Sequence, residues 1–297
     1  MIVKKALLTG ATGFIGSHLA TYLVADGWDV HIIIRPNSNY SLLRDIINNI
    51  TIYIHDGSSS DMLNIFSKAQ PATVFHLASL FLDQHQPEDI EPMIKSNILF
   101  GVQLLEAMKL HHVCRLINTG TSWQHYNNAD YDPVCLYAAT KQAFEDILKY
   151  YIETTSIHAI TLKLFDTFGP NDLRNKLFQL FKIMQDNTAA ISFSEGEQLI
   201  DLVYIDDVVD AFYKAAVLLQ NNSIIYDCFS ISSGHPLSLK DLVKIYCNLS
   251  GKQLPIDWGS KPYRPREVMI PWNMGKPLPN WHPKYSLESG IKKLLTF

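Results

Sequence analysis

The chain has little cysteine, no long apolar run and no excess of charge, and each shortage excludes a class of protein. Only 4 cysteines occur among 297 residues. Four cysteines are too few for a disulfide scaffold. They also stand far apart in the sequence, without the paired spacing of a zinc site. We therefore expect reduced thiols and no metal. The formal net charge of -4 gives no basic field for nucleic acid, so we expect no such partner.

Apolar residues are plentiful but never continuous over the length of a membrane span. The amino-terminal apolar run ends at Leu8 and lacks the anatomy of a signal peptide. We therefore expect a cytoplasmic protein without a membrane partner. With 47% hydrophobic and 18% charged residues, the composition is that of a globular chain with one large core and a smaller appendage.

Short apolar runs alternate with helical stretches through the first part of the chain. We expect strands near 6–8, 30–34, 50–54, 72–77, 115–118 and 159–164, with helices at 15–25, 91–108 and 137–151. This rhythm predicts an α/β fold: a doubly wound parallel-sheet Rossmann domain with a smaller C-terminal α/β substrate domain. We assign 1–166 to the Rossmann domain, with 202–232 returning to it. The substrate domain comprises 167–201 and 233–297.

A glycine-rich turn stands between the first strand and the first helix. It reads Gly10-Ala11-Thr12-Gly13-Phe14-Ile15-Gly16. The first glycine permits the tight turn, the second lets backbone approach a pyrophosphate, and the third lets helix pack on strand. The helix amino terminus then faces the phosphates. The pattern predicts a dinucleotide site with contacts from Gly10, Thr12, Gly13, Phe14 and Ile15.

The second strand ends in Arg35 rather than in a carboxylate. A carboxylate there would bind a ribose diol and repel a 2′-phosphate, whereas a guanidinium can pair with that phosphate. Arg35 therefore favours NADP, with NAD as the alternative. A solvent-exposed charge at the end of a strand is the plain structural explanation of the same residue.

Among 14 tyrosines, only Tyr137 has a lysine four residues later, Lys141. In a helix this spacing places both side chains on one face, where the ammonium would lower the pKa of the phenol. Tyr137 could then exchange a proton near neutral pH. A surface Tyr and Lys one turn apart would give the same spacing without any such role.

Together these motifs resemble the extended short-chain dehydrogenase/reductase family of sugar-nucleotide epimerases, dehydratases and reductases, over nearly the whole chain. The resemblance implies an adenine-side acidic position at Asp56-Gly57 and a nicotinamide-ribose loop at Leu77-Ala78-Ser79. It also implies cofactor-site positions at Asn97, the family's structural asparagine, and at Phe165. Tyr137 and Lys141 become the catalytic pair and contact the cofactor as well.

The resemblance also places the family's catalytic Ser or Thr at Thr121, with Ser122 as the alternative. A hydroxyl there would stabilise the developing alkoxide. The related 4,6-dehydratases carry Asp-Glu directly after this Thr, where the chain has Ser122-Trp123, so dehydration is disfavoured. Epimerases retain NAD, which suits an acidic second strand, whereas Arg35 favours NADPH as a stoichiometric reductant.

The segment from Asn118 to Tyr126 is similar to bacterial reductases of nucleotide-linked 4-keto-6-deoxyhexoses or 3,6-dideoxyhexoses. We expect NADPH-dependent reduction of the C4 ketone of a CDP- or dTDP-linked sugar, in deoxysugar synthesis for surface polysaccharide such as the O-antigen of lipopolysaccharide. The alternatives are a sugar-nucleotide 4-epimerase with retained NAD and a non-catalytic NADP-binding sensor or scaffold.

The nucleotide-sugar substrate needs cations for its diphosphate and a pocket for its sugar. The candidate diphosphate ligands are Arg174, Lys176, Arg264 and Arg266. The candidate sugar-site residues are Phe81, Ser122, Trp123, Gln124 and Asp166. Cys135 and His125 are expected to be packing residues, and the role of His85 stays open.

Family resemblance also implies a homodimer, paired through the helix that carries Tyr137 and its neighbour at 91–108. Packing of these amphipathic helices within one chain is the alternative.

Overall fold

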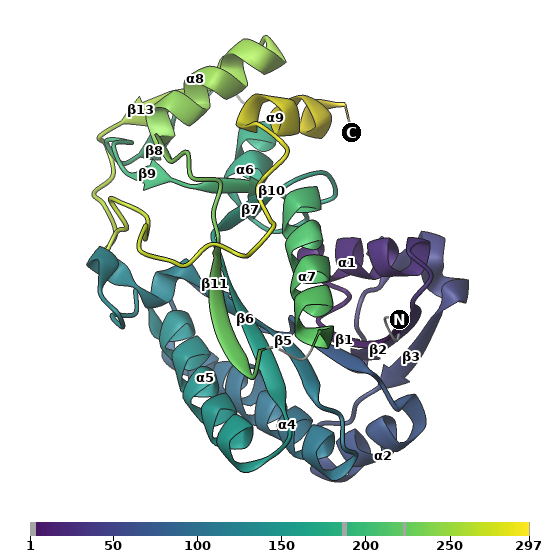
Figure 1. Ribbon diagram of the computed structural model, residues 1–297. Coiled ribbons are helices and arrows are strands. Elements are labelled where there is room, and N and C mark those ends of the chain that lie inside the picture. Colours follow the sequence, from purple (N-terminus) through teal and green to yellow (C-terminus); the bar gives the residue numbers. More distant parts are fainter. Residues whose placement is uncertain (1–3, 186–188, 222–223, 297) are drawn as a thin grey trace.

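The computed structural model describes residues 4–185, 189–221 and 224–296. Within these residues the main sheet has seven parallel strands in the order β11-β6-β5-β4-β1-β2-β3 (Figure 1). The strands are β1 (Lys5–Thr9), β2 (Asp29–Ile34), β3 (Ile50–Ile54), β4 (Thr73–His76), β5 (Arg115–Thr121), β6 (His158–Leu164) and β11 (Tyr226–Ile231). This doubly wound parallel sheet confirms the predicted fold class.

Helices cover both faces of the sheet (Figure 1). One face carries α1 (Phe14–Ala25) and α7 (Ile205–Gln220), and the other carries α2 (Ser59–Ala69), α4 (Phe100–Leu110) and α5 (Leu136–Thr154). Successive strand residues point to opposite faces: Leu8 packs in the core beneath α1 and α7, while Leu7 packs in the core beneath the other three helices. Burial on both sides suits the apolar centres of β1 and β2.

A smaller lobe lies beyond the carboxyl ends of the strands, in the upper part of Figure 1. Its elements are β7 (Asp166–Phe168), α6 (Leu177–Met184), β8 (Ile191–Phe193), β9 (Leu199–Ile200), β10 (Leu202–Tyr204), β12 (Leu237–Ser238), α8 (Leu239–Ser250), β13 (Ile256–Trp258) and α9 (Leu287–Leu295). Three short ladders, β10 with β7, β12 with β9 and β13 with β8, organise this lobe within the described residues.

The chain returns to the main sheet late, because β11 pairs with β6 in parallel. The preceding strand β10 pairs instead with β7. One apolar core runs from Leu8 in the sheet through Phe212 in α7 to Tyr246 in α8. The two parts share this core, so packing does not mark where one domain ends and the other begins. The domain boundaries expected from the sequence stay a prediction.

The helix expected at 91–108 is not continuous. Its first part is α3 (Ile90–Ile94), which follows a single 3-10 turn (η2, Pro87–Asp89), and a π-helical turn (η3, Lys95–Leu99) separates α3 from α4. The turn contains Asn97, which is buried and bonded to the loop after β4. A π turn of this kind rotates one residue out of helical register, often at a functional site. Here the turn places the side-chain amide of Asn97 within hydrogen-bond distance of Leu80.

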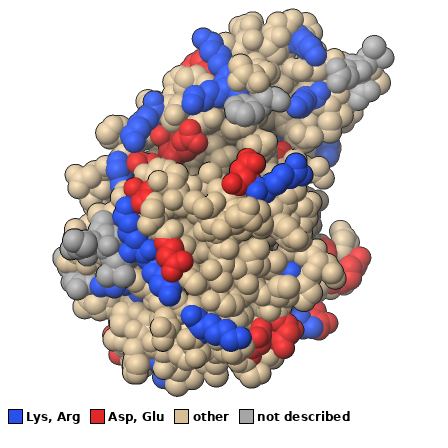
Figure 2. Space-filling view, turned by 90° about the vertical axis from the view of Figure 1, so that its right-hand side faces the viewer, with Lys and Arg blue, Asp and Glu red and all other residues tan. Residues whose placement is uncertain are grey.

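Charges of both signs intermingle on the face that Figure 2 shows, with broad uncharged areas between them. In the part of the chain that the structure describes, we find no helix whose length and apolarity would suffice for a membrane span.

Candidate functional site

The predicted cofactor-binding residues gather at the carboxyl edge of the main sheet, where open α/β folds hold ligands. Each group follows a different strand: Gly10, Thr12, Gly13, Phe14 and Ile15 follow β1, Arg35 follows β2, Asp56 and Gly57 follow β3, Leu77, Ala78 and Ser79 follow β4, and Phe165 follows β6. The sheet order therefore brings residues far apart in the sequence to one edge.

The glycine turn after β1 is shaped for close approach. Gly10 has φ 72°, and a Cβ there would meet the amide nitrogen of Ala78 at 2.6 Å. A Cβ on Gly16 would collide with the carbonyl of Gly10. Helix α1 begins after Gly13 with no side-chain cap, so its first amides are not capped by the chain itself. These features fit a dinucleotide pyrophosphate.

Arg35 sits in a short turn at the end of β2. Its amide donates to Oγ of Ser38 at 3.1 Å, and the Ser38 amide donates back to the Arg35 carbonyl at 3.2 Å. Arg35 is exposed at the same sheet edge as the glycine turn. This position fits the pairing with a ribose phosphate that the sequence predicts.

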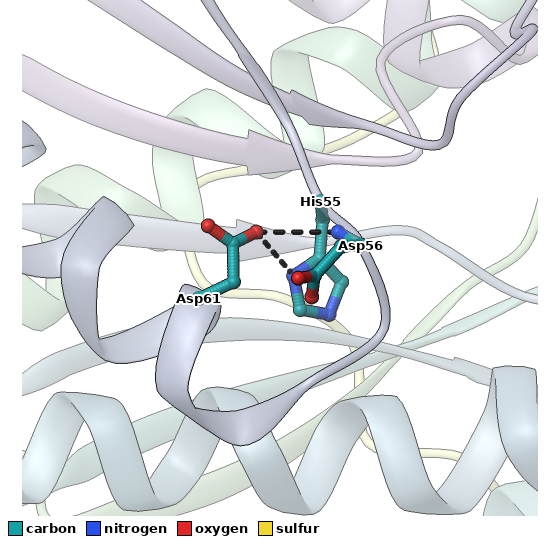
Figure 3. Close-up of side chains that lie close together, drawn as sticks. All are labelled: His55, Asp56 and Asp61. Carbon is teal, nitrogen blue, oxygen red and sulfur yellow. Dashed lines mark hydrogen bonds and ion pairs between the residues drawn. The ribbon is translucent and has the colours of Figure 1, made fainter.

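The loop after β3 is ordered by a cluster of polar side chains (Figure 3). One oxygen of Asp61 lies 3.2 Å from Nδ1 of His55 and accepts from the amide of Asp56 at 3.2 Å. Asp56 in turn accepts from the Ser58 amide at 2.7 Å. The side chains of His55, Asp56 and Asp61 bring possible metal-ligating atoms within 4.8 Å of one another. Because these oxygens already bind the loop, we assign the cluster to holding the predicted adenine-side position.

Asn97 ties the loop after β4 to helix α5. Its Oδ1 accepts from the Leu80 amide at 2.7 Å, and its Nδ2 donates to the Leu80 carbonyl at 3.0 Å and to Oγ1 of Thr140 at 2.9 Å. Thr140 Oγ1 donates to the carbonyl of Tyr137. Asn97 thus positions two parts of the site, and its own contact with the cofactor stays a prediction.

Tyr137 lies in the first turn of α5, buried against Phe81, whose ring meets it edge to face with centroids 4.9 Å apart. Burial raises the pKa of Tyr137 above its ordinary value, opposed by the Ser79 hydroxyl and by the charge of Arg174. Lys141 is not among the groups that lower it, so the expected lowering by Lys141 is wrong. Desolvation of the phenolate outweighs the one-turn spacing, and the phenol stays protonated.

Lys141 is also buried, one turn further along α5. Burial lowers its pKa to about 8; the Glu145 carboxylate opposes this shift and the Lys163 ammonium adds to it. Near neutral pH the side chain therefore remains a cation, which is the state needed to act on a phenol or to donate to a ribose hydroxyl.

Thr121 ends β5 and is 8% exposed. Its Oγ1 accepts from the amide of Trp123 at 3.3 Å, and its own amide donates to the side chain of Gln124 at 3.0 Å. Ser122, the alternative, lines the cavity described next. Gln124 does not line it, because Gln124 is fully buried behind the loop.

A cavity of about 620 Å³ opens between the sheet edge and the smaller lobe. Six of the predicted substrate-binding residues line it: Phe81, Ser122, Trp123, Asp166, Lys176 and Arg264. The lining mixes aromatic rings with charged groups, which suits a sugar joined to a diphosphate. Because Phe81 also packs on Tyr137, the phenol lies directly behind the cavity wall.

The two predicted diphosphate ligands that line the cavity, Lys176 and Arg264, are held by carboxylates. Arg264 pairs with Glu267 at 2.9 Å and with Asp83 at 2.7 Å. Lys176 lies 3.8 Å from Asp166 and 4.1 Å from the centroid of the Phe81 ring. These contacts fix both cations at the cavity.

The other two predicted diphosphate ligands lie elsewhere. Arg174 pairs with Asp172 at 2.7 Å and stacks over the ring of Phe14, with its Cζ 4.6 Å from the centroid. This places it beside the first turn of α1, on the cofactor side. Arg266 pairs with Asp132 and lies over the Tyr126 ring at 4.4 Å.

The residues with open roles have structural contacts. His125 stacks on Trp272 with centroids 4.0 Å apart. Cys135 stands at the N-cap of α5, where burial raises the pKa of its thiol. His85 is exposed in the loop after β4.

Sequence reasoning overlooked Glu145 and Lys163, which form a buried ion pair next to the site. The available signal was a lysine inside the apolar strand Ile160-Thr161-Leu162-Lys163-Leu164, since lysine is rarely buried unless it is paired.

Comparison with known proteins agrees with this geometry. The chain is 27% identical to CDP-abequose synthase of Salmonella muenchen, covering 99% of this chain and 97% of that protein. It is 25% identical to UDP-glucuronate 4-epimerase of Thermodesulfobacterium geofontis, covering 98% and 95%. The crystal structure of UDP-glucose 4-epimerase from Thermus thermophilus in complex with NAD superposes with a TM-score of 0.81 at 22% identity, covering 98% of both chains. Residues 6–226 match the model of the NAD dependent epimerase/dehydratase family, and the chain belongs to that family.

Proposed function

We propose that the protein reduces the C4 ketone of a nucleotide-activated 4-keto-6-deoxyhexose or 3,6-dideoxyhexose with NADPH. The nucleotide is CDP or dTDP, and the product serves deoxysugar synthesis for surface polysaccharide. The enzyme acts in the cytoplasm as a homodimer. The near full-length similarity to CDP-abequose synthase of Salmonella muenchen supports this choice within the family.

One observation carries the proposal. The protonated phenol of Tyr137 packs against the cavity lining, and the loop after Thr121 has no Asp or Glu directly after the threonine. Burial keeps the pKa of Tyr137 high, so its hydroxyl carries the proton that a general acid must supply. Ser122 and Trp123 follow Thr121 directly, in place of the Asp-Glu pair that the resemblance associates with dehydration. Without those two carboxylates, the loop after Thr121 supplies no base for proton transfer at neighbouring carbons, and reduction of the ketone is the simpler outcome.

When bound, the dinucleotide would supply the hydride. The Gly10–Ile15 turn would hold its pyrophosphate. Tyr137 would donate its hydroxyl proton to the ketone oxygen, and the Thr121 hydroxyl would donate a hydrogen bond to the developing alkoxide. Lys141, a cation below about pH 8, would donate a hydrogen bond to a ribose hydroxyl of the dinucleotide.

The preference for NADPH rests on Arg35, exposed at the end of β2. A guanidinium at this position can bind a 2′-phosphate through paired, charge-assisted hydrogen bonds. Reductive biosynthesis would then consume NADPH stoichiometrically.

The substrate diphosphate would lie between Lys176 and Arg264, which both line the cavity. Phe81 and Trp123, with centroids 5.6 Å apart, would pack against the sugar. Apolar rings there favour a hexose with missing hydroxyls, because a buried hydroxyl without a partner costs free energy.

A sugar-nucleotide 4-epimerase with retained NAD is the second candidate. It is favoured by the similarity to UDP-glucuronate 4-epimerase and by the fold shared with an NAD-bound epimerase. A non-catalytic NADP-binding scaffold is the third, and the buried Tyr137 and Lys141 weigh against it.

A panel of CDP- and dTDP-linked 4-keto sugars, each tested with NADPH and with NADH, discriminates these functions. The reductase consumes NADPH with at least one sugar. An epimerase purifies with bound NAD and interconverts C4 epimers with no added cofactor, while a scaffold does neither.

The dimer proposal draws on exposed apolar side chains near α4 and α5, including Leu99 at 46% and Tyr150 at 62% exposure. Sedimentation of Leu99→Glu tests it: dissociation supports this interface, and an unchanged dimer or a monomeric wild type contradicts it.

A further inference from the structure

A buried ion pair lies behind the loop that carries Thr121. Lys163 in β6 donates to both carboxylate oxygens of Glu145 in α5, at 2.8 Å each. The two side chains are 3% and 7% exposed. An apolar pair of similar volume is often at least as stable in a protein interior. Stability alone therefore does not account for these two charges.

Gln124 joins the ion pair to the catalytic loop. Its Oε1 accepts from the amide of Thr121 at 3.0 Å, and its Nε2 donates to Glu145 at 3.0 Å and to Gln142 at 2.8 Å. The connection Lys163–Glu145–Gln124–Thr121 thus ties together β6, α5 and the end of β5. Of these elements, β5 carries Thr121 and α5 carries Tyr137 and Lys141.

Gly120 leaves room for this connection. A Cβ on Gly120 would meet Lys163 Cδ at 2.8 Å, Glu145 Oε1 at 3.0 Å and Gln124 Oε1 at 3.1 Å. The backbone of β5 therefore lies directly against all three side chains, one residue before Thr121. Any larger residue would displace part of the network.

The ion pair also acts on Lys141, which precedes Glu145 by one helical turn on α5. The carboxylate of Glu145 raises the pKa of Lys141, and the ammonium of Lys163 lowers it. Since Lys141 is buried, these two charges are poorly screened by solvent.

Other titratable groups near these charges are neutral around pH 7. Burial lowers the pKa of His76 after β4, to about 3, and that of His125 after β5. Burial raises the pKa of Tyr226 and of Cys228 on β11, the latter to about 12. Tyr137 is neutral for the same reason. Glu145 and Lys163 are thus the charges that act on Lys141.

We propose that Glu145 and Lys163, with Gln124, form a positioning unit for the active site: they hold Thr121 against α5 and place one charge of each sign near Lys141. The roles of Thr121 and Lys141 come from the function proposed above. The ion pair itself is a property of the fold, so the unit can be tested without any substrate.

The test is an NMR titration of the full chain with isotope-labelled lysine side chains. The Lys141 resonance is identified by its loss in Lys141→Arg. We expect the pKa of Lys141 to fall in Glu145→Gln and to rise in Lys163→Met. Asp146→Asn removes a carboxylate from the exposed side of the same helix, and there the pKa should stay unchanged.

Opposite shifts in the two variants support the proposal, because a merely structural pair would not move the pKa of Lys141 in opposite directions. Absent shifts, or shifts of the same sign, overturn it. If removal of one partner unfolds the chain, the exchanged pair Glu145→Lys with Lys163→Glu decides. It keeps an ion pair but should lower the pKa of Lys141, and an unchanged value contradicts the proposal.

The link to Thr121 has its own readout, hydrogen exchange of the Thr121 amide. Gln124→Leu should accelerate that exchange while the amide of Val74, in the interior strand β4, keeps its wild-type rate. Equal rates in variant and wild type would contradict the link. None of these measurements uses a sugar nucleotide. A failure of the positioning unit can therefore be told apart from a failure of the proposed reductase activity.

Discussion

The ring of Phe81 meets the ring of Tyr137 edge to face, with 4.9 Å between their centroids. Phe81 lines the cavity, so the proposed proton donor packs against a residue of the space where a sugar would lie. Burial raises the pKa of Tyr137 and keeps the phenol protonated.

Tyr137→Phe removes the proton donor and leaves the packing with Phe81. We expect turnover to fall by about 10² to 10⁴-fold, the usual contribution of a general acid. Dinucleotide affinity, followed by titration of NADPH fluorescence, should change little. Tyr150→Phe, on the exposed side of the same helix, is the matched control. Undiminished turnover in Tyr137→Phe would remove the proton donor from the mechanism.

Arg35→Ser tests the cofactor preference. Loss of a charged hydrogen-bonding partner for the 2′-phosphate should weaken NADPH binding by roughly tenfold to a hundredfold. NADH affinity should stay the same, because NADH lacks that phosphate. Arg44→Ser removes an exposed cation from the following segment and should alter neither affinity. An equal loss for both dinucleotides would show that Arg35 does not read the phosphate.

Arg264→Gln tests the assignment of the diphosphate. The guanidinium lines the cavity and is oriented by Glu267 and Asp83. We expect the KM for the sugar nucleotide to rise by about tenfold or more, since charge-assisted bonds are the strong ones, with the KM for NADPH unchanged. Arg266→Gln should have a smaller effect, because Arg266 pairs with Asp132 outside the cavity lining. The reverse order would move the diphosphate toward Arg266.

Lys141→Met should inactivate the enzyme and stabilise the fold. Lys141 has a pKa of about 8 when folded, against an ordinary 10.5. The unfolded chain therefore binds more protons between these values, and wild-type stability gains with rising pH in that window. Below pH 8 the buried cation costs about 3 kcal/mol.

Thermal unfolding at several pH values measures this cost. The variant should melt at a higher temperature than wild type at pH 7, and the difference should shrink between about pH 8 and 10.5. Lys149→Met, at an exposed position on α5, should show no such difference. A variant less stable than wild type at pH 7 would mean that Lys141 is not a strained cation.

Local sequence patterns predicted the sheet and its glycine turn because those features depend on residues close together in the chain. The alternation of apolar runs located β1 to β6, and Gly10, Gly13 and Gly16 marked the turn that the structure shows. The π turn at Lys95–Leu99 was not predicted. Within it, Asn97 bonds to Leu80 and Thr140, tertiary contacts that helical periodicity does not predict.

Local sequence patterns predicted less of the candidate site. Gln124 follows the catalytic loop in sequence, yet its side chain turns inward to Glu145. The pKa of Tyr137 depends on its burial more than on its spacing from Lys141, and Phe81, from another loop, packs on its ring. Such effects arise from contacts between distant segments.

The stoichiometry of NADPH oxidation tests the central claim most directly. Purified protein, freed of bound nucleotide, is mixed with limiting NADPH and an excess of a CDP- or dTDP-linked 4-keto-deoxyhexose, and both products are quantified. The account predicts one NADPH oxidised for each C4 alcohol formed, and almost no oxidation with Tyr137→Phe over the same time. Interconversion of C4 epimers without net consumption of NADPH would contradict it.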